Sequence, residues 1–371
     1  MGRLVSLTAL MLLLVDTRAS ASAEMPAAVV SPMFTIRNLG AFPGDFEGAA
    51  YGLNNWGDAV GTSVTFDPSA FMPQRPDLFA NHKVLRFHTM PTETPPLDRG
   101  AAFSINDDGV AVGYAYAAKG PAHAAQFAPS ATSDLGTLLE YGNSYALGIN
   151  NLGQSVGYAD AVQTDNGILQ HATLYAGGRI IDLGTLVSGG YSYANAINDQ
   201  GIAVGYASTA TGAMHAVRFA SGTVTDLGTP PGGAGSFASG INTAGQVVGY
   251  AEFSAGVTHA ALFANGTITD LGTLPGGSGS IATAINNLGQ AVGSSTDATG
   301  TQRPVLFANG QVIDLGTFAG ITAAFPSAIN DQGQIVGTVD IVNIYYLDYS
   351  PTTLGVMWTP ASRASLPRRA P

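Results

Sequence analysis

Seven copies of one short pattern set the limits on what this chain can fold into. Each copy is Leu or Ile, then Asn, any two residues and Gly, and four of the six intervals between copies are 44 residues long. The other two intervals are 52 and 48 residues. A repeat of this length is typical of folds whose units bury apolar surface only against their neighbours. The asparagines of the pattern are Asn54, Asn106, Asn150, Asn198, Asn242, Asn286 and Asn330.

Each repeat divides into four short segments, named a to d in chain order. In the repeat around Asn242, segment a is "SFASGIN", segment b is "GQVVGYA", and "HAALF" and "GTITDLG" follow as c and d. Asn-x-x-Gly joins a to b and "ANG" or "ASG" joins c to d, which is the composition of tight hairpin turns. Four antiparallel strands per repeat are typical of a propeller blade. We therefore predict an all-β, seven-bladed β-propeller of four-stranded blades; a parallel β-helix, with shorter coils and fewer hairpins, is the alternative.

The two ends of the chain predict how the ring closes. Segment d lies 16 residues before each asparagine from Asn150 onward, and the same offset before Asn54 is Asn38, in "MFTIRNLG". Near the other end, "GVMWTP" resembles segment c, and no segment d follows it. We expect Phe34–Gly40 to pair beside Val356–Trp358, which completes the seventh blade and removes the open sheet edges.

The recurring "HA-x-x-F" and "AIN-x-x-G-x-x-VG" motifs resemble those of the HAF-family extracellular repeat proteins of bacteria. The resemblance covers roughly residues 34–358, and it is specific because the motifs recur in register. It implies export and a repeat fold. It implies no activity, and it carries no catalytic residues over to this chain.

The first residues have the composition of a secretory signal. Arg3 precedes the 12-residue apolar run Leu4–Val15, which is too short to span a bilayer, and Ala21-Ser22-Ala23 fits a cleavage site. The mature chain is therefore expected to be secreted, periplasmic or extracellular, with no membrane span after cleavage; an uncleaved anchor is the alternative. The predicted divisions are a signal peptide at 1–23, a single β-propeller domain at 24–360 and a basic, disordered tail at 361–371.

Charge and cysteine content exclude several classes of function. The formal net charge is −11, with 14 Lys and Arg against 25 Asp and Glu. Such a surface repels phosphate backbones, so nucleic acid is excluded as a partner, and an extracellular glycan or protein is expected. The chain has no Cys, which excludes thiolate catalysis and Cys-ligated zinc. We expect neither a cofactor nor a metal.

Strand order predicts that one His and one Asp meet in each blade. Segment a has the smallest side chains and is expected at the crowded axis, which makes d the outermost strand. The d–a and b–c connections then share one face, the top, and the a–b and c–d turns share the bottom. Segment c begins with His where its antiparallel neighbour d ends with Asp. Proton relays and metal sites use such pairs, but repetition in blade after blade indicates a structural bond. The pairs are His123–Asp134, His171–Asp182, His215–Asp226 and His259–Asp270, with Arg303 expected to meet Asp314 in the sixth repeat.

Two further repeated features are expected to be structural. The Asn of Ile-Asn ends segment a, where its side chain is expected to organise the a–b turn. The "GTLPGGSGS" connector is rich in Gly, but neither the Lys nor the helix of a phosphate-binding loop follows it, which indicates a simple loop.

A unique site is expected where the repeat is interrupted. We place segment c of the first repeat at 83–87 and a degenerate, Pro-rich segment d near Met90, which makes the b–c connections of the first and seventh repeats the longest. Both connections lie on the top face and become neighbours on ring closure. They offer a platform for sugars or a peptide, or else only cover the seam with a small core of their own. The candidate ligand-binding residues are Phe66, Asp67, Phe71, Arg75, Asp340, Tyr345, Tyr346, Asp348 and Tyr349.

The sequence holds no recognised catalytic constellation. Neither G-x-S-x-G nor H-E-x-x-H occurs, and the Glu residues, Glu47 among them, are scattered over the repeats. We therefore predict an exported, non-catalytic β-propeller that acts as a binding or surface scaffold, with a carbohydrate or peptide on the top face near the closure seam. A secreted polysaccharide hydrolase or lyase that uses top-face carboxylates is the alternative.

Overall fold

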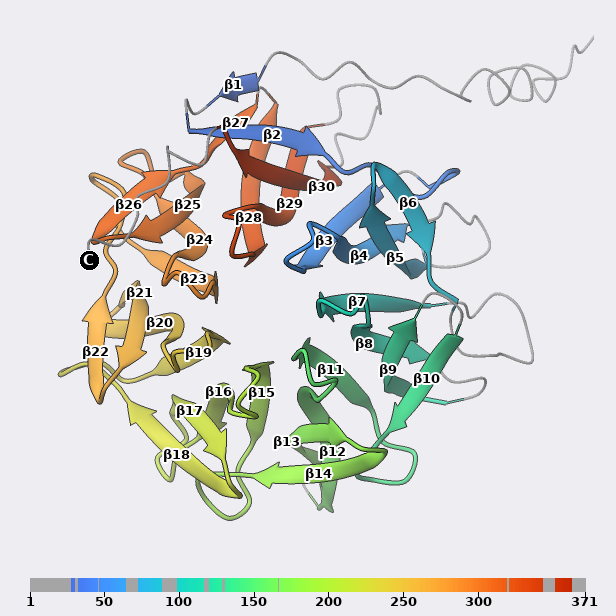
Figure 1. Ribbon diagram of the computed structural model, residues 1–371. Helices are drawn as coiled ribbons and strands as arrows, with labels where there is room; N and C mark the ends of the chain where they lie inside the picture. Colours follow the sequence, from blue (N-terminus) through green and yellow to red (C-terminus); the bar gives the residue numbers. More distant parts are fainter. Residues whose placement is uncertain are drawn as a thin grey trace, which may run out of the picture.

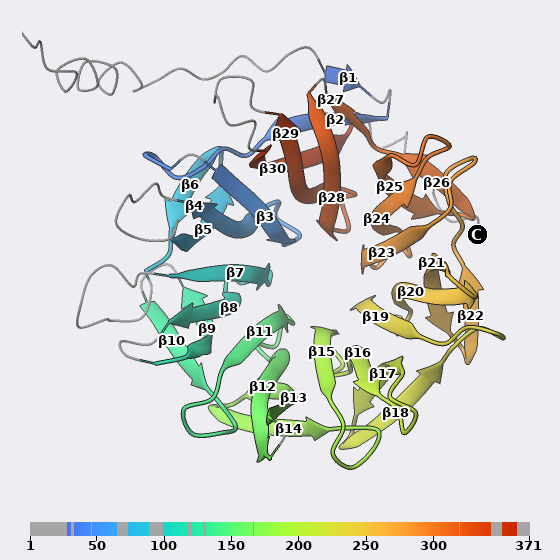
Figure 2. The same cartoon turned by 180° about the vertical axis from the view of Figure 1, so that it is seen from behind.

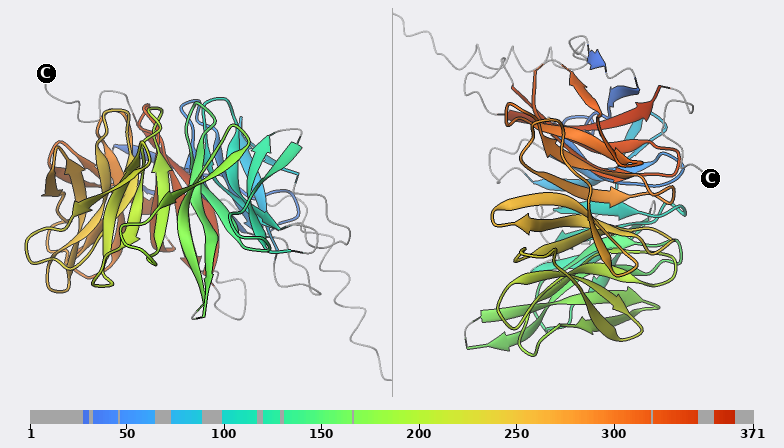
Figure 3. Two further views of the ribbon diagram at one scale, coloured as in Figure 1. Left: turned by 90° about the horizontal axis from the view of Figure 1, so that it is seen from below. Right: turned by 90° about the vertical axis from the view of Figure 1, so that its left-hand side faces the viewer.

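The computed structural model describes residues 28–30, 33–45, 47–64, 73–88, 99–116, 120–128, 131–165, 167–318, 320–342 and 351–361. Over these residues the chain forms seven four-stranded antiparallel sheets in a ring around a central channel (Figure 1). The predicted all-β, seven-bladed propeller is confirmed. Seen from the side, the ring is a disc (Figure 3). The described ranges contain no helix, and hence none of the length and apolar character needed to cross a membrane.

The first six blades follow one another along the chain, each built from four consecutive strands. Blades 1 to 3 consist of β3 (Glu47–Leu53), β4 (Ala59–Val64), β5 (Gln74–Ala80) and β6 (Lys83–Arg86); β7 (Gly100–Ile105), β8 (Ala111–Tyr116), β9 (Ala122–Ala128) and β10 (Ala131–Gly136); and β11 (Ser144–Ile149), β12 (Ser155–Thr164), β13 (Gly167–Ala176) and β14 (Arg179–Gly184). Blades 4 to 6 consist of β15 (Ser192–Ile197), β16 (Ala203–Ser208), β17 (Met214–Ala220) and β18 (Thr223–Gly228); β19 (Ser236–Ile241), β20 (Val247–Ser254), β21 (Val257–Ala264) and β22 (Thr267–Asp270); and β23 (Ser280–Ile285), β24 (Ala291–Thr296), β25 (Gln302–Ala308) and β26 (Gln311–Asp314). Blade 7 consists of β28 (Ile321–Ile329), β29 (Ile335–Val342), β30 (Pro351–Pro360) and, from the other end of the chain, β2 (Phe34–Asn38).

The first strand of every blade lies innermost, as the small side chains of segment a predict. These inner strands surround the channel in views from both sides (Figure 2). The ring closes through β2, which pairs antiparallel with β30 from Phe34 opposite Pro360 to Asn38 opposite Val356. The predicted pairing of the N-terminal strand with the last blade is confirmed. A separate two-stranded sheet, which the sequence did not indicate, joins β1 (Ala28–Val30) to β27 (Gly316–Phe318).

The apolar core lies between neighbouring blades. Val204 of β16, for example, packs with Ala238, Val247 and Phe263 of the next blade. Each blade therefore buries its faces only against its two neighbours, which is why the ring has to close.

The Gly of the repeated Val-Gly pair lets the two inner strands of a blade approach each other. In blade 3 a Cβ atom on Gly157 would lie 1.8 Å from the carbonyl oxygen of Tyr145. The inner strand carries a β-bulge at this level, where the register shifts between Ala146 and Gly148. Only Gly fits opposite such a close backbone approach.

The first blade differs from the sequence prediction. Its third strand is β5, in which Phe79 lies opposite Ala59 just as Phe219 lies opposite Ala203 in blade 4. The fourth strand is β6 (Lys83–Arg86), so the assignment of 83–87 as the third strand is wrong, and so is the assignment of the fourth strand near Met90. The connection between β4 and β5 is correspondingly shorter than we expected, and it spans residues 65–73.

The error arises at the turn between β5 and β6. Asn81 and His82 both have positive φ there, 50° and 60°, and His82 occupies the place that Gly takes in the equivalent turns. The missing Gly hides the hairpin from a search for turn residues. A closer internal comparison reveals it, because "QRPDLFAN" at 74–81 nearly repeats "QRPVLFAN" at 302–309.

Candidate functional site

Each repeated His lies against the Asp of its own blade. In blade 4, His215 Nδ1 is 2.8 Å from Asp226 Oδ2, and Asp226 Oδ1 accepts the amide of Gly228 at 2.7 Å. The carbonyl of Gly228 accepts the hydroxyl of Ser236, and the Ser236 oxygen accepts the amide of Ala216, the residue after the His. These links form a closed circuit that joins two outer strands of one blade to the inner strand of the next. The same circuit contains the pairs His123–Asp134, His171–Asp182 and His259–Asp270.

In each circuit both carboxylate oxygens of the Asp have a protein partner, although the Asp side chains are 38% to 42% exposed. The four His side chains are between 13% and 21% exposed, which leaves little imidazole surface for a ligand. Among the described residues, no group of three His, Cys, Asp or Glu side chains is placed to hold a metal ion. This geometry supports the structural role that we predicted for the pairs, and replacing them remains the test.

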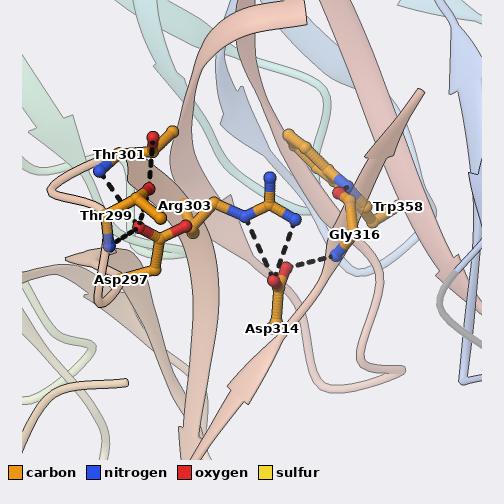
Figure 4. Close-up of polar contacts among 7 residues, drawn as sticks. All are labelled: Asp297, Thr299, Thr301, Arg303, Asp314, Gly316 and Trp358. Atoms are coloured by element: carbon orange, nitrogen blue, oxygen red, sulfur yellow. Dashed lines mark hydrogen bonds and ion pairs between the residues drawn. The ribbon is translucent and has the colours of Figure 1, made fainter. Parts of the chain in front are cut away.

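At the junction of blades 6 and 7 other residues make the circuit (Figure 4). Arg303 replaces His and donates to Asp314 Oδ2 at 3.2 Å from Nε and 3.1 Å from a terminal nitrogen. Asp314 Oδ1 accepts the amide of Gly316 at 2.7 Å, as in the other circuits. The serine is absent because the buried Ala324 occupies its position. Instead, the indole Nε1 of Trp358 donates to the Gly316 carbonyl at 3.2 Å.

The seven repeated asparagines form a closed ring of hydrogen bonds at the bottom of the channel. Asn198 Oδ1 accepts the amides of Gln200 and Ile202, which shapes the turn as predicted. Its Nδ2 also donates to the carbonyl of Asn242 in the next blade at 3.1 Å. The same bond between blades occurs at all seven junctions, with distances of 3.0–3.2 Å, and Asn330 returns it to Asn54. The sequence predicted the turn but not the ring.

The next residue of each turn forms a second, outer ring. Asn55, Asp107, Asn151, Thr243, Asn287 and Asp331 each bond through the backbone amide to the side chain one blade on, as Asn55 does to Asp107 at 2.8 Å. Between blades 4 and 5 the side chain of Gln200 bonds to the carbonyl of Thr243 instead. Together the two rings line a cavity of about 200 Å³ at the bottom mouth. Their polar atoms bond mainly to one another, so the residues at this mouth hold neighbouring blades together.

The two inner strands of blades 1–5 carry a continuous arc of nine aromatic rings. Within blade 3, Tyr145 of β11 and Tyr158 of β12 lie directly opposite each other and stack, with ring centroids 5.0 Å apart at 24°. Between blades, Tyr158 meets Tyr193 edge-on at 4.9 Å and 64°. Blades 4 and 5 repeat this alternation of stacked and edge-on pairs. The arc consists, in order, of Tyr51, Phe103, Tyr114, Tyr145, Tyr158, Tyr193, Tyr206, Phe237 and Tyr250.

All nine rings of this aromatic arc are half-buried, so the neighbouring rings cover part of each and leave part open. Burial raises the pKa of Tyr114 and Tyr206 to about 12, and the neighbouring tyrosines add to the increase. The pKa of Tyr158 is raised for the same reason. These hydroxyls therefore stay protonated donors at any physiological pH. The equivalent positions hold Ile281 and Ser294 in blade 6 and Phe325 and Thr338 in blade 7. Among the described residues no ring contact extends the arc into these two blades, so it is confined to one side of the channel.

Two carboxyl groups, those of Glu47 and Asp340, lie near Thr353 at the closure seam. The side chain of Thr353 in β30 donates to Asp340 Oδ1 at 3.3 Å, and its backbone amide bonds to Glu47. Burial raises the pKa of Glu47. The amide of Thr353 lowers it in part, and the negative charge of Asp340 raises it further. Asp340 was predicted as a site residue, whereas Glu47 was not. Their chain positions are so far apart that only ring closure brings them together.

A buried charge cluster replaces the His–Asp circuit in blade 1. Arg86 occupies the place of the Asp and forms an ion pair with Asp77 at 3.0 Å and another with Asp45. Its guanidinium also lies 4.0 Å from the ring centroid of Phe42. Burial raises the pKa of Asp77, while the bonds from Arg86 and Ser63 lower it. Asp77 is fully buried, so this cluster fastens the blade rather than presenting a charge to a ligand.

The other predicted ligand-binding residues can be placed only in part. Arg75, predicted in a loop, is the second residue of β5 and lies opposite Ser63. Phe66, Asp67, Phe71, Tyr345, Tyr346, Asp348 and Tyr349 lie outside the described residues.

Sequence reasoning missed the aromatic arc, although a signal for it exists. An aromatic residue follows Val-Gly in four repeats, and another stands five residues before the repeated Asn in four, three of which belong to the arc. Strand register and blade packing are needed to turn these separate positions into one line of contacts.

No family model and no curated protein matches this chain. The resemblance to the HAF family therefore remains a prediction from the motifs. Solved structures do share the fold. The acylaminoacyl peptidase of Pyrococcus horikoshii is 9% identical with a TM-score of 0.47, over 83% of this chain and 51% of that one. A puromycin hydrolase is 14% identical with a TM-score of 0.48, over 87% of this chain and 54% of that one.

The β-propeller domain of the Trilobed protease from Pyrococcus furiosus is 11% identical with a TM-score of 0.44, and the match covers 74% of this chain and 98% of that domain. The chain thus spans about half the length of the two hydrolases and nearly all of an isolated propeller domain. At these identities the likeness concerns the fold alone.

Proposed function

We propose that this chain is an exported, non-catalytic β-propeller that binds a carbohydrate or a peptide on its top face. The observation that carries the proposal is the contrast between the two mouths of the channel. At the bottom mouth, side-chain amides and carboxylates bond to one another in two rings. The top mouth carries half-buried aromatic rings and, across the seam, a pair of carboxyl groups. Ligand-binding surfaces combine aromatic area with a few polar groups in this way.

The rigid frame supports a binding role. Hydrogen-bonded circuits at the junctions and the asparagine ring fasten each blade to its neighbours, so the top-face side chains stand on a preorganised support. A preorganised surface loses little conformational entropy when a ligand binds.

The experiment that tests this function is a binding screen of the full-length protein on glycan and peptide arrays. We expect specific binding to one ligand class, and we expect the Asp340→Asn variant, at the seam, to bind more weakly than wild type if the seam takes part. Absence of binding on both arrays would contradict the proposal. Release of reducing sugars from bound polysaccharide would replace it with the second candidate.

The second candidate is a polysaccharide hydrolase or lyase, and the pairing of Glu47 with Asp340 favours it. Glycosidases use two carboxyl groups, of which one has a raised pKa and serves as the general acid. Glu47 has a raised pKa and reaches the same Thr353 as Asp340. If this candidate is correct, Glu47→Gln abolishes sugar release, while Glu140→Gln, at an exposed Glu of the β10–β11 loop, leaves it intact.

A further inference from the structure

We propose that the aromatic arc is a stacking surface for a neutral polysaccharide chain that lies along the top rim of the channel. The inference rests on the proposed binding function and names the ligand class and the site. It moves the site from the seam loops of the sequence prediction to the aromatic arc of blades 1–5.

The rings of the arc from Tyr114 to Tyr250 follow one another at a steady interval. Stacked pairs within blades have centroids 4.7–5.0 Å apart, and edge-on pairs between blades have centroids 4.9–5.2 Å apart. The C–H faces of pyranose rings are apolar and lie flat on aromatic rings, so a row of such rings suits a chain of identical sugar units. A surface of this form matches a repeating polymer better than a single small molecule.

The hydroxyl groups of the arc give it a polar edge. Tyr193 donates to Gln170 Oε1 at 2.6 Å. Over the described part of the chain, the hydroxyls of Tyr145, Tyr158, Tyr206 and Tyr250 have no protein partner and are not enclosed. They therefore bond to water and are free to exchange it for sugar hydroxyls. A lipid or an apolar peptide would leave these donors unsatisfied once it covered them.

Charge distinguishes among the ligands that stack on aromatic rings. The bases of a single-stranded nucleic acid also stack, but such sites need a positively charged groove for the phosphates. This chain has a net charge of −11. Asp160 lies near Tyr145, Tyr158 and Tyr193 of the arc, and Arg99 lies near Tyr114, so the arc has no positively charged groove. The same charge disfavours an anionic glycan, which leaves a neutral one.

The cavity below the arc limits how the ligand lies. Tyr51 and Phe103, the first two rings, also line a channel cavity of about 190 Å³ together with Asn195, Ser239 and Thr283. This volume is below that of typical ligand pockets, about 300–1,000 Å³. We therefore place the chain along the rim, with at most one terminal unit directed into the channel.

The test is affinity electrophoresis and calorimetry of the full-length protein with neutral polysaccharides: mixed-linkage β-glucan, xylan, galactomannan and dextran. Wild type is expected to bind at least one of them. The double variant Tyr158→Leu/Tyr206→Leu keeps the bulk and removes two rings, and is expected to bind about 100-fold more weakly at roughly tenfold per ring. Tyr158→Phe/Tyr206→Phe keeps both rings and is expected to weaken binding by less than tenfold.

The matched control is Trp56→Leu, an equally large change at an exposed aromatic residue on the bottom face. It is expected to bind like wild type, and thermal unfolding of every variant checks that the ring is intact. Unchanged binding in the Leu pair would overturn the inference. So would binding of anionic glycans or peptides alone, although the proposed function would then stand. Binding of nothing on any array or gel would overturn both.

Discussion

The indole of Trp358 bonds to the carbonyl of Gly316 at the one described Asp-Leu-Gly junction where the buried serine of the repeat is an alanine, Ala324. One exception to the repeat is thus matched by another, on a different strand of the same blade. Variants at Trp358 and Ala324 therefore measure how much the circuit contributes to the free energy of unfolding.

Trp358→Phe is expected to lower the free energy of unfolding by about 1–2 kcal/mol, because a buried carbonyl loses a hydrogen bond and some volume is lost. Adding Ala324→Ser restores the serine of the other junctions and is expected to recover about half of this loss. Denaturant unfolding of the single and double variants measures both effects. If Ala324→Ser stabilises wild type as much as the Trp358→Phe variant, the two side chains do not share a role.

Replacement of one ring asparagine separates its two tasks. Asn198→Ala removes three hydrogen bonds and is expected to cost about 2–4 kcal/mol. Asn198→Asp keeps the bonds that shape the turn but directs a carboxylate oxygen at the carbonyl of Asn242. We expect Asp at this position to be more harmful at pH 7 than at pH 5, because protonation restores a donor. Unfolding of the variant and of wild type at both pH values measures this effect. If the variant is no less destabilised at pH 5 than at pH 7, the bond between blades is unimportant.

Acid should weaken the His–Asp circuits. Burial raises the pKa of Asp182, but the bonds from His171 and from the amide of Gly184 exceed this effect and hold the pKa below its usual 3.8. A depressed folded-state pKa gives stability that is present above the unfolded value and is lost as the pH falls through the folded one. We expect the midpoint of unfolding to decrease once the pH is lowered below about 4.

His171→Ala is expected to flatten this acid dependence as well as to lower stability at neutral pH. His82→Ala is the control, because His82 lies outside the circuits and contacts Arg37. If stability falls equally steeply with decreasing pH in wild type and both variants, protonation of the circuits is not linked to unfolding.

Ionisation of the arc tyrosines at alkaline pH is expected to destabilise the fold. Because the pKa of Tyr114 and Tyr206 is raised to about 12 from 10.0, their contribution to stability is complete below pH 10 and is lost between pH 10 and 12. Spectrophotometric titration of tyrosinate should therefore show a late step that coincides with loss of the fold. Tyr206→Phe should reduce the late step and leave the early one. A single step near pH 10 for all 14 tyrosines would contradict the packing described for the arc.

The fold was predictable where the repeat carries local signals. Turn residues marked most of the hairpins, and an offset of 16 residues located Asn38 in the strand that closes the ring. The approach failed at His82, where a residue other than Gly adopts positive φ and the turn lost its signature. Strand assignment in the first blade failed with it.

The site was less predictable, because its contacts depend on geometry across blades. The sequence shows that Tyr145 and Tyr158 recur at fixed positions, but not that strand register places them opposite each other. It shows Asn198 at the end of a strand, but not the carbonyl of Asn242 within reach. Glu47 and Asp340 meet only because the two ends of the chain share a seam.

The closing strand has a consequence for biogenesis. β2 is among the first strands to be synthesised and its partner β30 is the last, so blade 7 cannot assemble until translation of the propeller is complete. Until then one face of blade 1 and one of blade 6 have no neighbour. The chain therefore stays an open, incompletely packed array while it is made. Closure is then a single late step that converts a linear array into a ring.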